Sequence, residues 1–159
     1  MKDTITPKGH VQIEIIRADG SHKKEQEGPN AISSELTQKL AFTLQGANSA
    51  YGVMTSAFDN DDFSTPPNNE SGIIIVDTSS NRYQTKTTLD ATTQTSFTIK
   101  GVVRASQSYT IDKALMGHDW STQVNDYDVK FSEYDFSPNI SLSDGDQLNV
   151  TWVITIANS

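Results

Sequence analysis

The chain has 159 residues, no cysteine, 35% hydrophobic residues and a formal net charge of −8. This length suits one domain, residues 1–159, with a single core. The lack of cysteine excludes disulfides and thiolate metal sites. The acidic balance disfavours nucleic acid as a partner, because phosphate binding needs clustered Lys and Arg. The first residues lack the apolar stretch of a signal peptide and no apolar run is long enough for a membrane span, so we expect synthesis in the cytoplasm and no membrane partner.

Residues 1–8 are expected to form a flexible N-terminal arm, and a strand is predicted at 9–18. Within that strand Val11, Ile13 and Ile15 alternate with other residues, so they share one face. Asp19 and Gly20 then form a pair that favours a turn. The polar residues 21–30 are predicted to be a loop.

Apolar residues recur at helical spacing after this loop. Ile32, Leu36, Leu40 and Leu44 lie four positions apart, which places them on one face of a helix. Ser33 is of a type that helix starts prefer. We predict one amphipathic helix at 31–45, which packs its apolar face on a sheet.

The middle of the chain is predicted to be rich in short strands. We expect strands at 50–58, 73–76, 82–89, 94–105 and 127–136, separated by residues that favour turns. The run 73–76 is wholly apolar and is predicted to be covered on both faces. Residues 59–71 are acidic and contain two consecutive prolines, so they are expected to form a loop.

The last residues carry the clearest structural signal. Leu148, Val150 and Trp152 alternate with polar residues and predict a strand at 147–157 inside the core sheet. Asp144 and Gly145 precede it as a hairpin turn, an interpretation that we prefer to a metal site. The predicted fold class is therefore mainly β: an antiparallel β-sandwich, jelly-roll-like, with one amphipathic α-helix near the N-terminus.

No pattern in the sequence predicts catalysis. The histidines, His10, His22 and His118, are scattered, without a second ligand at metal-binding spacing. No serine lies in a Gly-X-Ser-X-Gly elbow. We therefore expect no enzyme activity, no catalytic residue, no metal site and no cofactor.

The acidic loop partly imitates a calcium-binding loop. Asp59, Asp61 and Glu70 match its first, third and twelfth positions, but Ser64 stands where a glycine makes the sharp turn. We interpret the loop as solvated. A different calcium geometry remains an alternative, in which Asp61 contributes to binding.

The aromatic residues of the C-terminal half allow two interpretations, a core or a platform on which sugar rings stack. Alternation along one strand favours the core for most of them. Trp120 and Tyr134 are the two that this pattern explains least, so they are the candidate ligand contacts. The set is Trp120, Tyr127, Phe131, Tyr134, Phe136 and Trp152.

Residues 145–154 have the form Gly-Asp-x-Leu-x-Val-x-Trp-x-Ile, and residues 28–32, Gly-Pro-Asn-Ala-Ile, open the predicted helix. In this order, with a strand-rich middle between them, these segments resemble a group of minor virion proteins of tailed bacteriophages. The resemblance implies a structural protein that is made in the cytoplasm of the host bacterium and incorporated in the virion. It also implies other virion proteins as partners, and a homo-oligomer.

The sequence thus leads to two functional hypotheses. The first is a non-enzymatic assembly protein of the virion, for capsid decoration, collar, tail or fibre attachment. Its candidate contact segments are the arm at 1–8 and the loops at 21–30 and 59–71, because polar segments without a core role are free to meet partners. The alternative is a carbohydrate-binding module for receptor recognition, in which Trp120 contacts the glycan.

Overall fold

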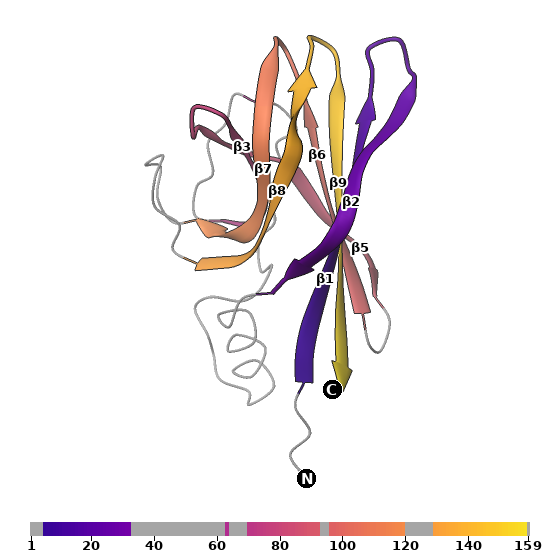
Figure 1. The fold of residues 1–159 in the computed structure, drawn as a ribbon, viewed down its shortest axis with the longest axis vertical. Coiled ribbons are helices and arrows are strands. Elements are labelled where there is room, and N and C mark those ends of the chain that lie inside the picture. The colour runs from indigo at the N-terminus through magenta and orange to yellow at the C-terminus, as the bar shows by residue number, and fades with distance from the viewer. Residues whose placement is uncertain (1–4, 33–62, 64–69, 93–95, 120–128, 159) are drawn as a thin grey trace.

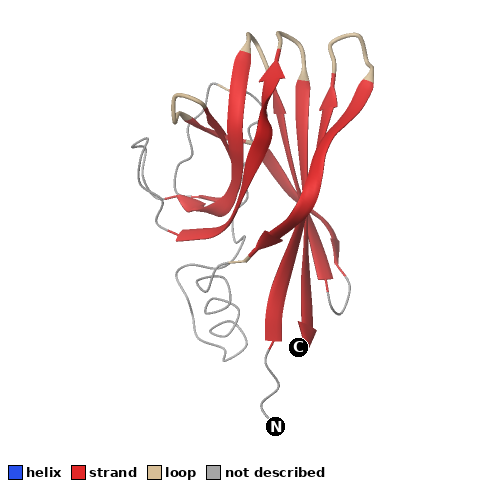
Figure 2. Ribbon diagram, viewed as in Figure 1, coloured by secondary structure: helices blue, strands red, loops and turns tan. Residues whose placement is uncertain are grey.

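The computed structural model describes residues 5–32, 63, 70–92, 96–119 and 129–158. These residues form two antiparallel sheets that pack face to face (Figure 1, Figure 2). The five-stranded sheet has the order β2-β1-β9-β6-β5 and the four-stranded sheet has the order β4-β3-β7-β8. The strands are β1 (Ile5–Ile16), β2 (His22–Ala31), β3 (Glu70–Asp77), β4 (Arg82–Gln84), β5 (Lys86–Thr92), β6 (Ser96–Arg104), β7 (Tyr109–Asp119), β8 (Val129–Leu142) and β9 (Gln147–Asn158).

The core lies between the sheets and consists of alternate residues of each strand. Ile13 of β1 and Trp152 of β9 are fully buried, as are Val11 and Val150, because side chains of one parity all point inward. β9 pairs with β1 along its whole length and with β6 on its other side. The prediction of a C-terminal strand inside the core sheet is therefore confirmed.

The connections β1–β2, β6–β7 and β8–β9 lie together at one end of the molecule, at the top of Figure 1, and we name this the turn end. Gly20 and Gly145 both have φ of +85° there, a conformation that glycine adopts without a steric penalty. The turns predicted from Asp19-Gly20 and Asp144-Gly145 are confirmed. The N- and C-terminal ends of the described chain lie at the opposite end (Figure 1).

The four-stranded sheet is apolar on both faces. Ile73 and Ile75 face the core, whereas Ile74, Val76 and Leu115 form a second buried cluster on the outer face, each at most 5% exposed. The wholly apolar run 73–76 is thus covered on both sides, as predicted. Among the described residues there is no helix that could cross a membrane.

The predicted fold class is wrong in its helix and in its jelly-roll topology. The described residues contain no helix: Ala31 ends β2, and Ile32 forms a bridge with Ser132 of β8. The other residues of the predicted helix, 33–45, lie outside the described part. In a jelly roll most consecutive strands lie in opposite sheets, whereas here β1–β2, β5–β6 and β7–β8 each pair within one sheet. What the structure shows is a mainly β fold of two antiparallel sheets.

Three further segments differ from the sequence predictions. Residues 22–31 form β2 instead of a loop, and β1 begins at Ile5, within the predicted arm. The predicted strand 82–89 is divided at Thr85, where the chain passes from the four-stranded to the five-stranded sheet. β7 had no counterpart in the prediction, while the strand predicted at 50–58 lies outside the described residues.

Candidate functional site

A depression of about 360 Å³ lies on the outer face of the five-stranded sheet, across β1, β9 and β6. Strand register sets its side chains in two rows, and each row runs over three neighbouring strands. Since adjacent strands lie about 4.8 Å apart, a row spans roughly 10 Å. The first row is Gln12, Thr151 and Lys100, and the second is Glu14, Asn149 and Val102.

The shape of the depression follows from the lengths of its side chains. β9 supplies the short side chains Asn149 and Thr151 in the middle, while Gln12 and Glu14 of β1 are longer and form one wall. Lys100 of β6 stands on the other side. The site is therefore a trough along the central strand, lined by amide, hydroxyl, carboxylate and ammonium groups.

Two neighbouring side chains orient groups at the edge of the depression. Gln147 donates a hydrogen bond from Nε2 to Oδ1 of Asn149 at 2.8 Å, which directs the Asn149 amide. His22 Nδ1 lies 3.5 Å from Oε1 of Glu14. The polar groups on β9 and β1 are thus held by neighbours in the same sheet.

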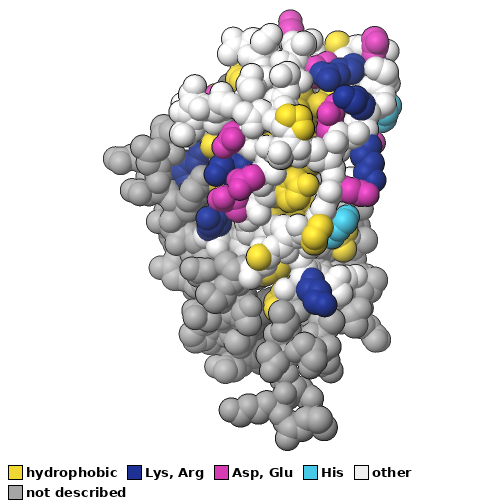
Figure 3. Space-filling model, viewed as in Figure 1, with side chains coloured by type: hydrophobic (Ala, Val, Ile, Leu, Met, Phe, Trp, Pro, Cys, Tyr) yellow, Lys and Arg dark blue, Asp and Glu magenta, His cyan; other side chains and the backbone are white. Residues whose placement is uncertain are grey.

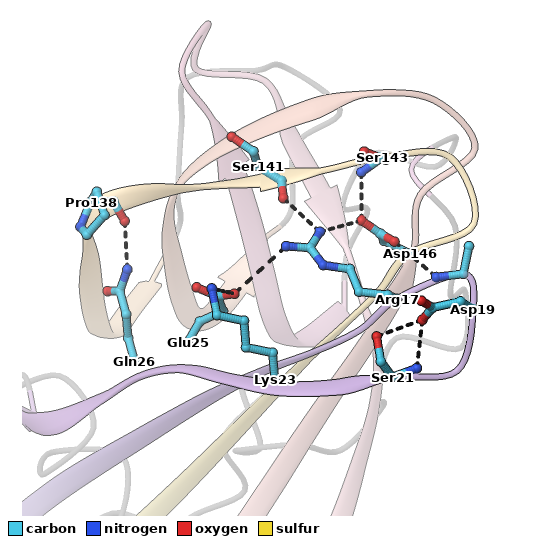
Figure 4. Close-up of polar contacts among 11 residues, drawn as sticks. Arg17, Asp19, Ser21, Lys23, Glu25, Gln26, Pro138, Ser141, Ser143 and Asp146 are labelled. Atoms are coloured by element: carbon cyan, nitrogen blue, oxygen red, sulfur yellow. Dashed lines mark hydrogen bonds and ion pairs between the residues drawn. The ribbon is translucent and has the colours of Figure 1, made fainter.

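Asp146 connects the turns at the end of β1 and at the start of β9, two strands of the depression (Figure 4). Its side chain is 3% exposed, and its Oδ2 accepts hydrogen bonds from Arg17 Nη1 at 2.6 Å and from the Ser143 amide at 2.8 Å. Oδ1 accepts the Ala18 amide at 3.1 Å. The backbone of Ala105 bonds to Gly145 and to Asp146. The carboxylate therefore fastens the β1–β2 turn to the β8–β9 turn, and the backbone of the β8–β9 turn holds the β6–β7 connection at Ala105.

These contacts also determine the ionisation of Asp146. Burial by itself would raise the pKa of its carboxyl, but the Ser143 amide, the Arg17 guanidinium and the Ala18 amide together lower that pKa below its usual value. The side chain is therefore a carboxylate at neutral pH. Because its oxygens accept these hydrogen bonds, Asp146 has a structural role in the turn that was predicted at Asp144-Gly145.

A second polar network closes the sandwich where β2 meets β8. Trp152 donates from Nε1 to Asn30 Oδ1 at 3.1 Å, and Asn30 donates from Nδ2 to the Ser132 hydroxyl and to the Glu133 carbonyl. Ser132 in turn donates to the Ala31 carbonyl at 2.7 Å. This network keeps residues 30–32 extended, which is the physical reason why the helix predicted from residue 31 does not begin there.

The side-chain amide of Gln26 also joins β2 to β8, with one donated and one accepted hydrogen bond. It donates to the Pro138 carbonyl at 2.6 Å (Figure 4) and accepts the Ser137 amide at 3.0 Å. Beside this seam, Figure 3 shows charged side chains in two groups, one over β2 and one over β7 and β8, with apolar side chains between them. In the group over β7 and β8, Lys113 lies 3.4 Å from Glu133 and 3.5 Å from Asp135.

The structure places only one of the candidate contacts predicted from the sequence. Tyr134 is half-buried on the inner face of β8, 6.1 Å from the Phe136 ring, and a Cβ added at Gly28 would lie 3.3 Å from its hydroxyl. Trp120 and Asp61 lie outside the described residues, as does most of the acidic loop. Within the described part, no group of three or more His, Asp and Glu residues is arranged to hold a metal ion.

Sequence reasoning missed the residues of the depression. Gln12 and Glu14 alternate with buried residues of β1, and Asn149 and Thr151 do the same in β9, so the pattern placed them on the outer face. The pattern could not show that the two strands are neighbours. No protein-family model matches the chain, and no curated protein or solved structure matches it at a significant level.

Proposed function

We propose that this protein is a non-enzymatic structural component of a bacteriophage virion and acts through protein–protein interfaces. Its site in the particle would be the capsid surface, the collar, the tail or a fibre attachment. Its partners would be other virion proteins and further copies of itself, after synthesis in the cytoplasm of the host bacterium. The motif at residues 145–154, which carries the resemblance to minor virion proteins, supports the proposal.

The observation that carries most weight is the position of β9. This strand, which contains the motif, lies between β1 and β6. The outermost strands β2 and β8 are joined by the contacts of Asn30 with Ser132 and Glu133 and by those of Gln26, and β4 continues into β5 through Thr85. Contacts of this kind between edge strands hinder uncontrolled strand pairing at those points. A two-sheet fold with these contacts suits a subunit that binds its neighbours through the faces of its sheets.

The proposal is tested on particles and on the purified protein. Mass spectrometry of phage particles purified from cells that express the gene should detect the chain in a fixed ratio to the major capsid protein. Light scattering after size-exclusion chromatography should give a homo-oligomer. A protein that is monomeric at all concentrations and absent from purified particles would refute the proposal.

A second function, glycan binding in receptor recognition, is supported by a separate observation. The depression on the five-stranded sheet gathers amide, hydroxyl and carboxylate groups, which are the groups that hydrogen-bond to sugar hydroxyls. This function is compatible with a place on a fibre or tail. A screen of the purified protein on immobilised glycans tests it, and the absence of binding to any glycan would exclude it.

A further inference from the structure

We propose that the depression over β1, β9 and β6 binds a neutral hexopyranose ring. The inference rests on the second proposed function, glycan binding, and assigns it a site and a ligand class. The site differs from the aromatic contacts predicted from the sequence, since it contains no aromatic side chain. Its recognition is therefore based on hydrogen bonds.

The polar side chains of the trough suit adjacent hydroxyl groups. Gln12 and Asn149 each carry a carbonyl acceptor and an amide donor, so either can contact two neighbouring hydroxyls at once. Glu14 accepts hydrogen bonds, and charged acceptors form the stronger ones. Thr151 both donates and accepts. A sugar ring, whose hydroxyls also do both, complements this set.

The remaining lining matches the carbon skeleton of a sugar. Val102 lies in the row of Asn149 and is only partly exposed, so it offers an apolar surface for ring C–H groups. The volume of about 360 Å³ lies near the lower end of the roughly 300–1,000 Å³ of small-molecule sites. The depression therefore suits a ligand of one or two rings.

Charge distinguishes neutral sugars from acidic ones. The chain has a net charge of −8, and a field of this sign lowers the local concentration of anions. Within the trough, the carboxylate of Glu14 stands opposite the ammonium of Lys100, so the site offers no net positive charge to hold a carboxylate or phosphate. Neutral hexoses avoid the penalty of the overall negative field, so they are the expected ligands.

Strand addition by a peptide does not fit this position. β9 pairs with β1 and β6, β1 also pairs with β2, and β6 also pairs with β5. The backbone groups of the three strands are thus used within the sheet, whereas strand addition needs an exposed edge. Only side chains remain to contact a ligand, and they stand on paired strands, which lowers the entropy cost of binding.

The test is a titration of the isotope-labelled protein, followed by amide NMR, with D-glucose, D-galactose, D-mannose and N-acetyl-D-glucosamine in turn. At least one sugar should shift the amide signals of residues 12–14, 100–102 and 149–151. Gln12→Ala and Thr151→Ala should each weaken that binding by about three- to tenfold, which corresponds to one lost hydrogen bond.

Thr110→Ala is the matched control, because Thr110 is an exposed strand threonine of the other sheet; this variant should bind as the unchanged protein does. The proposed site would be refuted if the shifts were confined to other parts of the chain, or if Gln12→Ala and Thr151→Ala bound the sugar as tightly as the unchanged protein does. Glycan binding itself would then still stand. If no sugar shifts any signal and the glycan screen is also negative, both the inference and the second proposed function fail. Detection in particles, which tests the virion proposal, is independent of these outcomes.

Discussion

The substitution Asp146→Asn tests whether one carboxylate holds the turn end together. Asparagine keeps the shape of the side chain but replaces one acceptor oxygen with an NH₂ group. In the unchanged protein, the Asp146 carboxylate accepts hydrogen bonds from three donors: Arg17, the Ser143 amide and the Ala18 amide. In whichever orientation the new amide group takes, at least one backbone N–H faces another donor. Arg17 also loses the nearer of its two carboxylate partners, since Glu25 lies 3.9 Å away.

The expected loss of stability follows from these contacts. A buried donor left without an acceptor costs about 1–3 kcal/mol. The loss of charge adds about 1 kcal/mol, a value at the low end because the Arg17 side chain is 35% exposed and solvent screens the pair. We therefore expect Asp146→Asn to lower the free energy of unfolding by about 3 kcal/mol, which lowers the Tm of a chain of this size by roughly 6–12 °C.

The assay is thermal and urea unfolding at pH 7, followed by circular dichroism. Asp144→Asn is the matched control, since it makes the same change two residues away at an exposed position of the same turn; its effect should stay within about 0.5 kcal/mol. If the two variants differ by less than about 1 kcal/mol, the account of Asp146 as the fastening of the turn end is wrong.

Three further predictions concern contacts inside the sandwich and the turn end. Asn30→Ala leaves the Trp152 indole N–H without its acceptor, so urea unfolding should show a free energy of unfolding that is lower by about 1–3 kcal/mol. An unchanged urea midpoint would show that the Asn30 network does not stabilise the fold. Gly101→Val should destabilise the protein by about 1–3 kcal/mol, measured as a lower Tm, because even a Cβ at this position lies 2.5 Å from Thr85 Oγ1; an equal Tm would show that the sheets can separate there. Because the pKa of Asp146 is lower in the folded state than its value of 3.8 when unperturbed, its contribution is complete above the unfolded pKa and is lost as the pH falls through the folded pKa. The difference in stability between the unchanged protein and Asp146→Asn should therefore shrink as the pH falls from 5 towards 2, and a constant difference would refute this sign.

Local sequence determined the strands whose alternation is uninterrupted. In β9, Leu148, Val150 and Trp152 fall on one face whatever the strand pairs with, because side chains alternate along any strand. The glycine turns at Gly20 and Gly145 follow from the conformational freedom of glycine, which is also a local property. These features were therefore predicted correctly.

β7 was missed because its alternation is interrupted. The register with β8 shifts between Ile111 and Lys113, so the inward-facing residues change parity after that point. Leu115 is also buried on the outer face, which removes the polar positions that a half-exposed strand would show. A bulge and burial on both faces are consequences of packing, and a window of sequence does not contain them.

Tertiary structure alone decided what becomes of residues 22–32 and where the polar residues gather. β2 is polar and has little strand signal, yet its backbone pairs with β1, and Asn30 is held extended by Trp152 from the far end of the chain. Likewise, the sequence places Gln12 and Thr151 on outer faces, but only the pairing of β1 with β9 makes them neighbours. Alternation is encoded residue by residue, whereas pairing brings together segments that lie more than a hundred residues apart, so the candidate site exists only in the folded protein.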